Sequence, residues 1–356
     1  MNTAPYALGF LMGSILLSQQ VLAAPASLDV TVQATQTEHT AGEPLWVEVT
    51  LRNDSPQSVQ FLTWNTPFEG SFTADMFQID GVRATYLGKL VKRAAPAAGE
   101  IHTLAPGAVL RATIDLAQGY AFEQDGTATV RLATTIMQVV SAKTGQGLAL
   151  EAQPLTSNAV AMSLHDTWLT AKQWQAPLPQ SGTANCSSSQ SSAIGSALSA
   201  ATSMASDASS VLSSTSEEKR PAAARYVTWF GAYTAQRYST ISSHFSNIRN
   251  NLSKASVDCT CDGVSDPSST FAYVYPNQPY TIHVCGAFWQ APVSGTDSKG
   301  GTLVHEMSHF NVIAGTNDHV YGQSAARNLA KTNPDQAIDN ADNHEYFAEN
   351  NPRLSM

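Results

Sequence analysis

The sequence predicts a multidomain protein in which an all-β, immunoglobulin-like sandwich is followed by an α+β domain. The chain has 356 residues, a length typical of two or three domains. Short segments of alternating apolar and polar residues continue to about residue 165, whereas later segments show helical periodicity. A stretch rich in Pro, Gly and polar residues separates the two patterns, so we expect a domain boundary there.

Residues 24–165 are predicted to form the sandwich, because their strand candidates alternate and are bounded by turn residues. Leu28–Val32, Leu45–Leu51 and Thr127–Leu132 each place apolar side chains on one face. Gly, Pro, Asn and Asp occur between such segments, as in sandwiches built from many short strands. This part of the sequence has no grouping of residues that is typical of a catalytic site.

Residues 1–23 are predicted to be a secretory signal peptide. An apolar segment spans Tyr6–Leu17, and Val21–Ala23 provides an acceptable cleavage site before Ala24. The apolar segment is too short and too interrupted to cross a membrane, and no later segment qualifies. We therefore expect an exported protein without a membrane span.

Residues 166–183 are predicted to be a linker, and the elements after it mix helices with strands. Ser187–Ser216 is rich in Ser and Ala, but its apolar residues are spaced like one face of a helix. Ala222–Leu252 is predicted to be a second helix with an aromatic core face. Phe271–Tyr275 and Tyr280–Cys285 are predicted strands of one hairpin.

The final domain, residues 184–356, contains His305, Glu306 and His309 in the pattern H-E-x-x-H. On a helix both imidazoles lie on one face and can bind one zinc ion, while the glutamate points at a water beside the metal. Apolar residues surround this motif, and polar groups in such a setting are costly unless they are paired or metal-bound. A catalytic zinc site needs a third protein ligand, for which Asp318 is the first candidate.

Three other residues compete with Asp318 as the third ligand. His319 is adjacent to it, and Glu345 and Glu349 lie on a predicted later helix, where other zinc peptidases place a ligating glutamate. The motif favours Asp318, and we expect His319 beside the metal site or facing solvent. His344 has no role in the motif, and we expect it on the surface of its helix.

The H-E-x-x-H motif and the G-T-x-D-x-x-Y-G that follows at residues 315–322 resemble the signature of the aspzincins, which include deuterolysins and peptidyl-Lys metalloendopeptidases. Residues 285–289 and 340–350 also resemble this family, the second segment in particular its lysine-directed branch. The resemblance extends from about Cys186 to the C-terminus and implies a zincin-like catalytic domain. It implies one zinc ion held by His305, His309 and Asp318, with Glu306 as general base and Tyr321 as hydrogen-bond donor to the transition state.

The sequence also contains a candidate pocket for lysine. Asp342 and Glu345 are spaced to share one face of a helix expected from about Gln336 to Ala348. An acidic helix face is usually a solvated surface, and the residues alone leave this interpretation open. Resemblance to the peptidyl-Lys enzymes implies that both carboxylates receive the compact ammonium of the lysine that follows the cut bond.

Four cysteines, all in the C-terminal half, predict disulfides in an exported protein, although four cysteines allow three pairings. Cys259 and Cys261 flank a single residue, so a bond between them would be strained. Zinc binding by thiolates is the alternative, but the spacing matches structural zinc sites poorly. The family resemblance implies the pairs Cys186–Cys259 and Cys261–Cys285.

Together these features predict a secreted zinc endopeptidase that cuts proteins and peptides on the amino side of lysine. The formal net charge of −9, without a basic stripe, argues against nucleic acid as a partner. We expect the N-terminal domain to be a prodomain that assists folding and keeps the enzyme latent, although a permanent accessory module is an alternative. The junction contains an Ala171–Lys172 bond that the enzyme itself could cut.

Two other functions remain open from the sequence. A deuterolysin-like endopeptidase would share the metal chemistry but lack strict lysine specificity. A non-catalytic binding module would hold zinc as a structural ion with a fourth ligand, whereas a catalytic site keeps one coordination position open.

Overall fold

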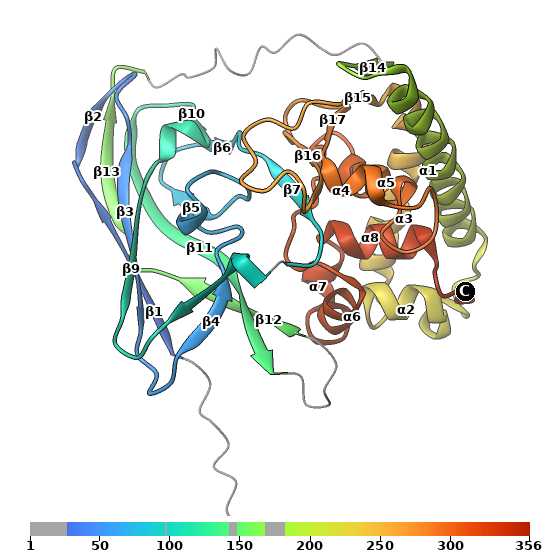
Figure 1. Ribbon diagram of the computed structural model, residues 1–356, viewed down its shortest axis with the longest axis horizontal. Coiled ribbons are helices and arrows are strands. Elements are labelled where there is room, and N and C mark those ends of the chain that lie inside the picture. The colour runs from blue at the N-terminus through green and yellow to red at the C-terminus, as the bar shows by residue number, and fades with distance from the viewer. Residues whose placement is uncertain (1–26, 97, 142–147, 168–181) are drawn as a thin grey trace, which may run out of the picture.

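The computed structural model describes residues 27–96, 98–141, 148–167 and 182–356. The predicted signal peptide, residues 1–23, and the Ala171–Lys172 bond lie outside the described residues. Figure 1 shows a β-rich N-terminal region beside a C-terminal region in which helices pack around a sheet. None of the helices in the described ranges is both long and apolar enough to span a lipid bilayer.

The described residues of the N-terminal region form several sheets. One sheet has the order β1-β3-β9, a small one pairs β10 with β6, and a larger one is arranged around the long strand β11. The strands are β1 (Leu28–Ala34), β2 (Glu38–Thr40), β3 (Trp46–Asn53), β4 (Val59–Leu62), β5 (Phe77–Asp80), β6 (Ala84–Tyr86), β7 (Leu90–Arg93), β8 (Ile101–Leu104), β9 (Val109–Asp115), β10 (Tyr120–Phe122), β11 (Gly126–Ser141), β12 (Leu148–Thr156) and β13 (Val160–His165).

Alternation along β3 explains why this region folds as sheets. Val47, Val49 and Leu51 are fully buried, while Glu48 and Thr50 between them are partly exposed. The strand pairs antiparallel with β1 on one side and β9 on the other, so its apolar face joins a common core. The predicted all-β character is confirmed, whereas an immunoglobulin-like arrangement is not established by these sheets and stays a prediction.

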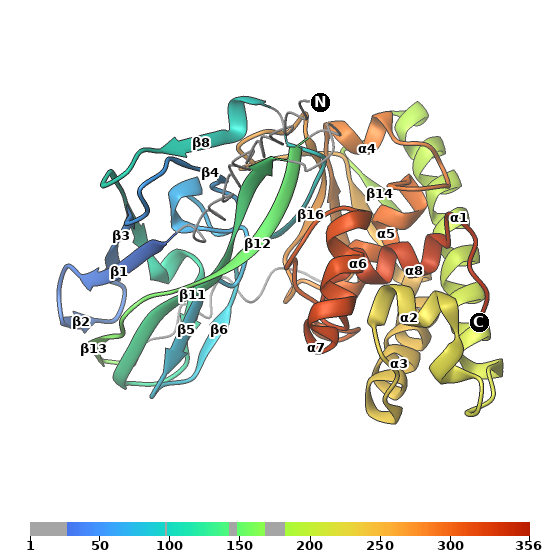
Figure 2. The same cartoon turned by 90° about the horizontal axis from the view of Figure 1, so that it is seen from below.

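The C-terminal region combines a sheet with helices that cover it. Its strands are β14 (Gly182–Ala184), β15 (Ser256–Asp258), β16 (Thr270–Val274) and β17 (Thr281–Val284). Its helices are α1 (Ser188–Ser214), α2 (Ala224–Phe230), α3 (Ala235–Asn251), α4 (Gly286–Gln290), α5 (Lys299–His309), α6 (Gln323–Thr332), α7 (Pro334–Ala337) and α8 (Ala341–Glu349). Figure 2 shows α6 and α7 on the side that faces the β-rich region.

Helix α1 forms as predicted despite its low-complexity composition. Ser187 caps its first turn and forms a reciprocal capping box with Gln190. Small buried residues recur four apart on one face, which allows neighbouring helices to approach closely. These residues are Ala197, Ala201, Ala205 and Ser209.

Two helices that the sequence predicted as continuous are interrupted. The expected helix Ala222–Leu252 is broken at Gly231, whose φ of 75° is left-handed and whose Cβ position would lie 2.1 Å from the carbonyl oxygen of Ala330. The expected helix Gln336–Ala348 is split between α7 and α8. At that break Asn340 accepts hydrogen bonds from two backbone N–H groups of the loop after α5.

The sheet of the C-terminal region contains one strand from the N-terminal region. Its order is β14-β15-β17-β16-β7, and β7 pairs antiparallel with β16. Figure 1 shows β7 entering the C-terminal region beside β16. Side chains on both strands are buried, so this pairing brings residues about 180 positions apart in sequence into one core.

Two disulfides tie the loops around this sheet. They join Cys186 to Cys259 and Cys261 to Cys285, which are the pairs that the family resemblance implies. The first links the start of α1 to the end of β15, and the second links the following loop to the end of β17. The chain segments on either side of β16 are thereby held together covalently.

Candidate metal centre and lysine pocket

Helix α5 carries the H-E-x-x-H motif and lies entirely in the protein interior. Ser298 caps its N-terminus by accepting a hydrogen bond from the N–H of Gly301, and every residue of the helix is buried. The spacing of His305 and His309 places their rings on one face, with centroids 4.8 Å apart. A polar pair at this depth requires compensation, either from other polar groups or from a metal ion.

The loop after α5 returns the chain to this face and brings Asp318 to the histidines. Gly315 adopts a left-handed φ of 63°, and the N–H of Thr316 donates to the carbonyl of Ser308 at 3.1 Å. The carbonyl of Thr316 lies 2.8 Å from Nδ1 of His309. Since that nitrogen donates to the carbonyl, Nε2 of His309 is left as the electron-pair donor.

Three side chains converge at one point in a manner that fits zinc. Nε2 of His305 lies 3.2 Å from Asp318 Oδ1, and Nε2 of His309 lies 3.4 Å from Asp318 Oδ2. Potential ligand atoms of these residues are all within 4.8 Å of one another. Both Nε2 atoms and both Asp318 oxygens are buried and have no hydrogen-bond partner, as expected where a cation is to be bound.

The environment of Asp318 keeps its carboxylate ionised. Burial alone would raise its pKa, but the adjacent imidazoles of His309 and His305 lower it below the ordinary value. Two imidazoles, which are neutral when they bind a metal, and one carboxylate form a donor set that zinc prefers.

The competing third ligands have other partners in the structure. Nε2 of His319 lies 2.7 Å from Asp339 Oδ2, and this partly exposed ring is not grouped with His305, His309 and Asp318. Glu349 accepts hydrogen bonds from the backbone N–H and the hydroxyl of Ser298. Glu345 lies near the second ring nitrogen of His305. Of the four candidates, Asp318 is the one grouped with both Nε2 atoms.

Glu306 lies close enough to His305, His309 and Asp318 for their charges to shift its pKa. Both of its carboxylate oxygens are buried and lack a hydrogen-bond partner. Burial raises the pKa of Glu306 to about 7, although the two neighbouring imidazoles oppose the rise. A carboxylate with a pKa near neutral is well suited to exchange protons with a substrate or a water.

Asp342 and Glu345, which were assigned to a lysine pocket from the sequence, form a buried acidic pair, and the side chain of Lys92 lies between them. The Nζ atom of Lys92, on β7, lies 3.2 Å from Asp342 Oδ1 and 2.5 Å from Glu345 Oε2. All three side chains are at most 1% exposed. Burial alone would lower the pKa of Lys92, but the carboxylates of Asp342 and Glu345 raise it well above its ordinary value, so the side chain is an ammonium.

The acidic pair also borders the metal centre. Nδ1 of His305 lies 3.0 Å from Asp342 Oδ1 and 3.3 Å from Glu345 Oε2. The second oxygen of Asp342 accepts a hydrogen bond from the N–H of Gly322 at 2.6 Å. A carboxylate behind a metal-binding histidine orients the ring and increases its basicity. The sequence did not indicate this second role of Asp342.

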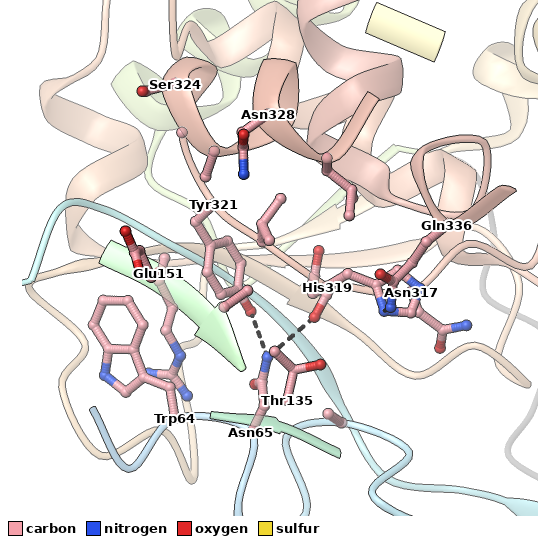
Figure 3. A pocket seen from close by; sticks show the side chains of 18 of the residues that line it. Trp64, Asn65, Thr135, Glu151, Asn317, His319, Tyr321, Ser324, Asn328 and Gln336 are labelled. Atoms are coloured by element: carbon pink, nitrogen blue, oxygen red, sulfur yellow. Dashed lines mark hydrogen bonds between the residues drawn. The ribbon is translucent and has the colours of Figure 1, made fainter. Parts of the chain in front are cut away.

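Tyr321 contacts the backbone carbonyl that precedes Lys92. Its hydroxyl donates to the carbonyl of Val91 at 2.9 Å and accepts from Nδ2 of Asn65 at 3.1 Å. Figure 3 shows Asn65 pointing toward Tyr321, with Trp64 close by. A cavity of about 1470 Å³, lined by residues of both regions, opens beside these side chains.

Several contributors to the site could not have been identified from the sequence. Lys92 and Asn65 lie in the N-terminal region, where no motif marks them, and Thr316 acts through its backbone carbonyl. The expectation for His344 was wrong: it is fully buried, and its Nε2 lies 3.0 Å from Nδ1 of His244. Residues 341–348 of α8 are all buried, so this part of the helix has no solvated face.

Comparison with known proteins identifies relatives along most of the chain. An aspzincin family model described as "Lysine-specific metallo-endopeptidase" matches residues 215–349. An "Extracellular protease" of Aeromonas hydrophila is 39% identical over 319 residues, which cover 86% of this chain and 88% of that protein. A "Peptidyl-Lys metalloendopeptidase" of Grifola frondosa is 35% identical over 322 residues, covering 87% and 89%. The solved structure of a zinc peptidase from Grifola frondosa is 51% identical, covers 48% of this chain and 100% of that chain, and has a TM-score of 0.45.

Proposed function

The chain belongs to the aspzincin family of zinc metalloendopeptidases, and we propose that it is a secreted enzyme that cuts peptide bonds on the amino side of lysine. The observation that carries this proposal is the position of β7. Lys92 places its ammonium between Asp342 and Glu345, and the carbonyl that precedes it accepts a hydrogen bond from Tyr321. A substrate with lysine after the cut bond is expected to bind in this way.

The backbone of β7 supports the same interpretation. It runs antiparallel to β16, with Val91 opposite Tyr273 and Lys92 opposite Ala272. Extended peptides commonly bind proteases and other proteins by adding a strand to a sheet edge. Selectivity for lysine over arginine follows from the pocket, because two converging carboxylates match a compact ammonium better than a longer planar guanidinium.

The proposed roles of the site residues follow from their positions. His305, His309 and Asp318 would hold zinc, which when bound polarises the scissile carbonyl and lowers the pKa of the attacking water. Glu306 takes a proton from that water and delivers it to the leaving amine. The hydroxyl of Tyr321 donates to the carbonyl oxygen as negative charge develops on it.

We assign residues 24–165 to a prodomain that keeps the enzyme latent, with residues 166–183 as the linker and 184–356 as the catalytic domain. The support is steric, because β7 occupies the edge of β16 and the acidic pair that a substrate would need. Secretion through the signal peptide at 1–23 and cleavage near Ala171–Lys172 are part of this proposal. N-terminal sequencing of the mature secreted protein tests it, and a start before residue 100 would rule out removal of the prodomain.

Lysine specificity is tested by digesting a defined, unfolded protein with the processed enzyme and identifying every new N-terminus by mass spectrometry. We expect lysine at nearly all of them. A broad distribution of residues would support the deuterolysin-like alternative instead. Absence of any cleavage by zinc-loaded, processed protein would favour the binding module with structural zinc.

A further inference from the structure

Lys89 and the first residues of β7, which precede Lys92, are held by the C-terminal region. Leu90 is buried in the apolar core that contains α5 and α8. The ammonium of Lys89 donates to the carbonyls of Asp262 and Gly263 at 2.5 and 2.7 Å. It also lies 4.5 Å from the centre of the Tyr273 ring. These contacts would hold the amino-terminal half of the strand in place even if the strand were cut.

The side chain of the residue that follows Lys92 is held by the N-terminal region, while its backbone continues the pairing with β16. Arg93 forms a buried ion pair with Glu69, with side chains 1% and 3% exposed, and its guanidinium lies 5.1 Å from the Trp64 ring. The second oxygen of Glu69 accepts from the N–H of Asn65 at 3.1 Å and from the hydroxyl of Thr73 at 2.7 Å. We call the contact of Arg93 with Glu69 and Trp64 the Arg93 clamp.

The Val91–Lys92 peptide bond therefore lies between side-chain anchors on both sides, at Lys89 and Leu90 before it and at Arg93 after it. We propose that β7 binds as a true substrate whose Val91–Lys92 bond is presented for hydrolysis, and that the Arg93 clamp keeps this bond intact. The inference rests on the proposed lysine-directed function and adds the residues that make the bound segment an inhibitor. Glu69, Trp64 and Arg93 are thus positioning residues, since they act on the reacting bond through Lys92.

The chemistry explains why anchoring both halves preserves the bond. Hydrolysis breaks the C–N bond between Val91 and Lys92, water supplies the oxygen of a new Val91 carboxylate, and a proton passes to the Lys92 amine. Ordinary products then diffuse apart. Here the two ends stay in contact, and groups held in reacting geometry reach effective concentrations of about 10⁵ M or more, which favours re-formation of the bond.

Breaking the clamp removes the side-chain anchor at Arg93 without changing the lysine pocket. In Glu69→Gln the side-chain amide oxygen can still accept from Asn65 and Thr73, but Arg93 loses its charged partner. The segment that begins at the new Lys92 amine is then held only by the Lys92 side chain and by backbone pairing with β16. It separates more readily, so hydrolysis at this bond is reversed less often. Loss of one partner of a buried ion pair predicts at least about tenfold faster cleavage than in the unmodified chain.

The test uses the full-length, zinc-loaded chain and follows the appearance of an N-terminus at Lys92 by mass spectrometry. We expect it in Glu69→Gln at a rate that does not depend on protein concentration, and we expect little of it in the unmodified chain. Glu48→Gln is the matched control, because it disrupts the exposed ion pair of Glu48 with Arg111 in the same region. Equal cleavage at Lys92 in the unmodified chain and in Glu69→Gln would overturn the proposal.

A second readout does not depend on catalysis. In a Glu306→Gln background, Lys92 should resist acetylation by an amine-reactive reagent with or without the Glu69→Gln change, because the acidic pair still covers its ammonium. Rapid labelling in the Glu69→Gln chain would mean that the clamp merely docks the strand, and would also overturn the proposal. If Glu69→Gln fails to fold, the double variant Glu69→Gln/Arg93→Met removes both charges and is the substitute in both assays.

The test of the Arg93 clamp can be distinguished from the test of the proposed lysine specificity. Peptide mapping with the processed, unmodified enzyme reports lysine specificity without involving β7. One outcome is that peptide mapping shows lysine specificity while the Val91–Lys92 bond stays intact in clamp variants that are otherwise processed and active. That combination would reject the clamp but not the proposed function. Mapping without lysine preference would reject the proposed function itself.

Discussion

The metal centre and the lysine pocket share His305 but differ in how their buried charges are compensated. At the metal centre, the Nε2 atoms of His305 and His309 and the oxygens of Asp318 face one another without hydrogen-bond partners. In the lysine pocket, Asp342 and Glu345 are met by the ammonium of Lys92. Under the proposed function, the first site is completed by an ion from solution, whereas the second must lose Lys92 before a substrate can enter.

The strongest test of this contrast is Asp318→Ala. Loss of the third ligand should abolish stoichiometric zinc binding and reduce peptidase activity of the processed enzyme to background. Metal analysis by mass spectrometry and a peptide cleavage assay measure the two effects. Asp339→Ala is the control, since this residue contacts His319 outside the three-ligand group. Stoichiometric zinc in Asp318→Ala would show that another residue completes the site.

Glu306→Gln should separate metal binding from catalysis. The substitution removes the general base but none of the three grouped ligands, so zinc should remain bound while kcat falls by about 10²- to 10⁴-fold. Activity close to that of the unmodified enzyme would remove Glu306 as the base. Loss of zinc would instead mean that Glu306 contributes to the metal centre.

Lys92→Met tests the pocket side of the comparison through stability. The substitution leaves two buried carboxylates without their cation, and removing one partner of such a group costs about 3–5 kcal/mol. Urea unfolding of the full-length chain, in a Glu306→Gln background that prevents self-digestion, measures the change. Arg111→Met is the matched control, since Arg111 pairs with Glu48 at the surface and its loss should cost less than about 1 kcal/mol. Similar losses in both variants would contradict the proposed pairing energy.

Glu349→Gln should have the smallest effect, visible mainly as a change in pH dependence. Burial and the nearby carboxylate of Glu345 raise the pKa of Glu349 to about 8. Between pH 4.5 and pH 8 the folded state therefore keeps a proton on Glu349 that the unfolded chain has lost. The stabilisation that this proton provides is present at low pH and is lost as the pH rises toward 8. The melting temperature of the variant should fall less steeply between pH 5 and pH 8. An unchanged slope would contradict the shift.

The candidate metal ligands, Glu306 and the acidic pair could be predicted because the residues of each group lie close together in the sequence. His305, Glu306 and His309 lie on one helix, and Asp342 and Glu345 on another, so sequence spacing alone brought each set together. Asp318 needed only one turn at Gly315. The family resemblance supplied the role of Tyr321, and the structure places its hydroxyl against the carbonyl before Lys92.

The occupant of the pocket could not be predicted in the same way. Lys92 reaches Asp342 across 250 positions of sequence, through a strand pairing whose register no local pattern specifies. The helix breaks at Gly231 and at Asn340 were missed for a related reason. Both depend on contacts with distant backbone groups, the Ala330 carbonyl in one case and the N–H groups of His319 and Val320 in the other.

The strand order of the mixed sheet has a consequence for producing the enzyme. Without β7, strand β16 becomes the outer strand and exposes its row of unpaired N–H and C=O groups, a template on which other chains can assemble. A fragment without β7 would have this unpaired strand edge. It would also contain two buried carboxylates, Asp342 and Glu345, that repel each other. We therefore expect soluble, active material to be recovered when the chain is expressed together with β7 and is then cut at the proposed junction.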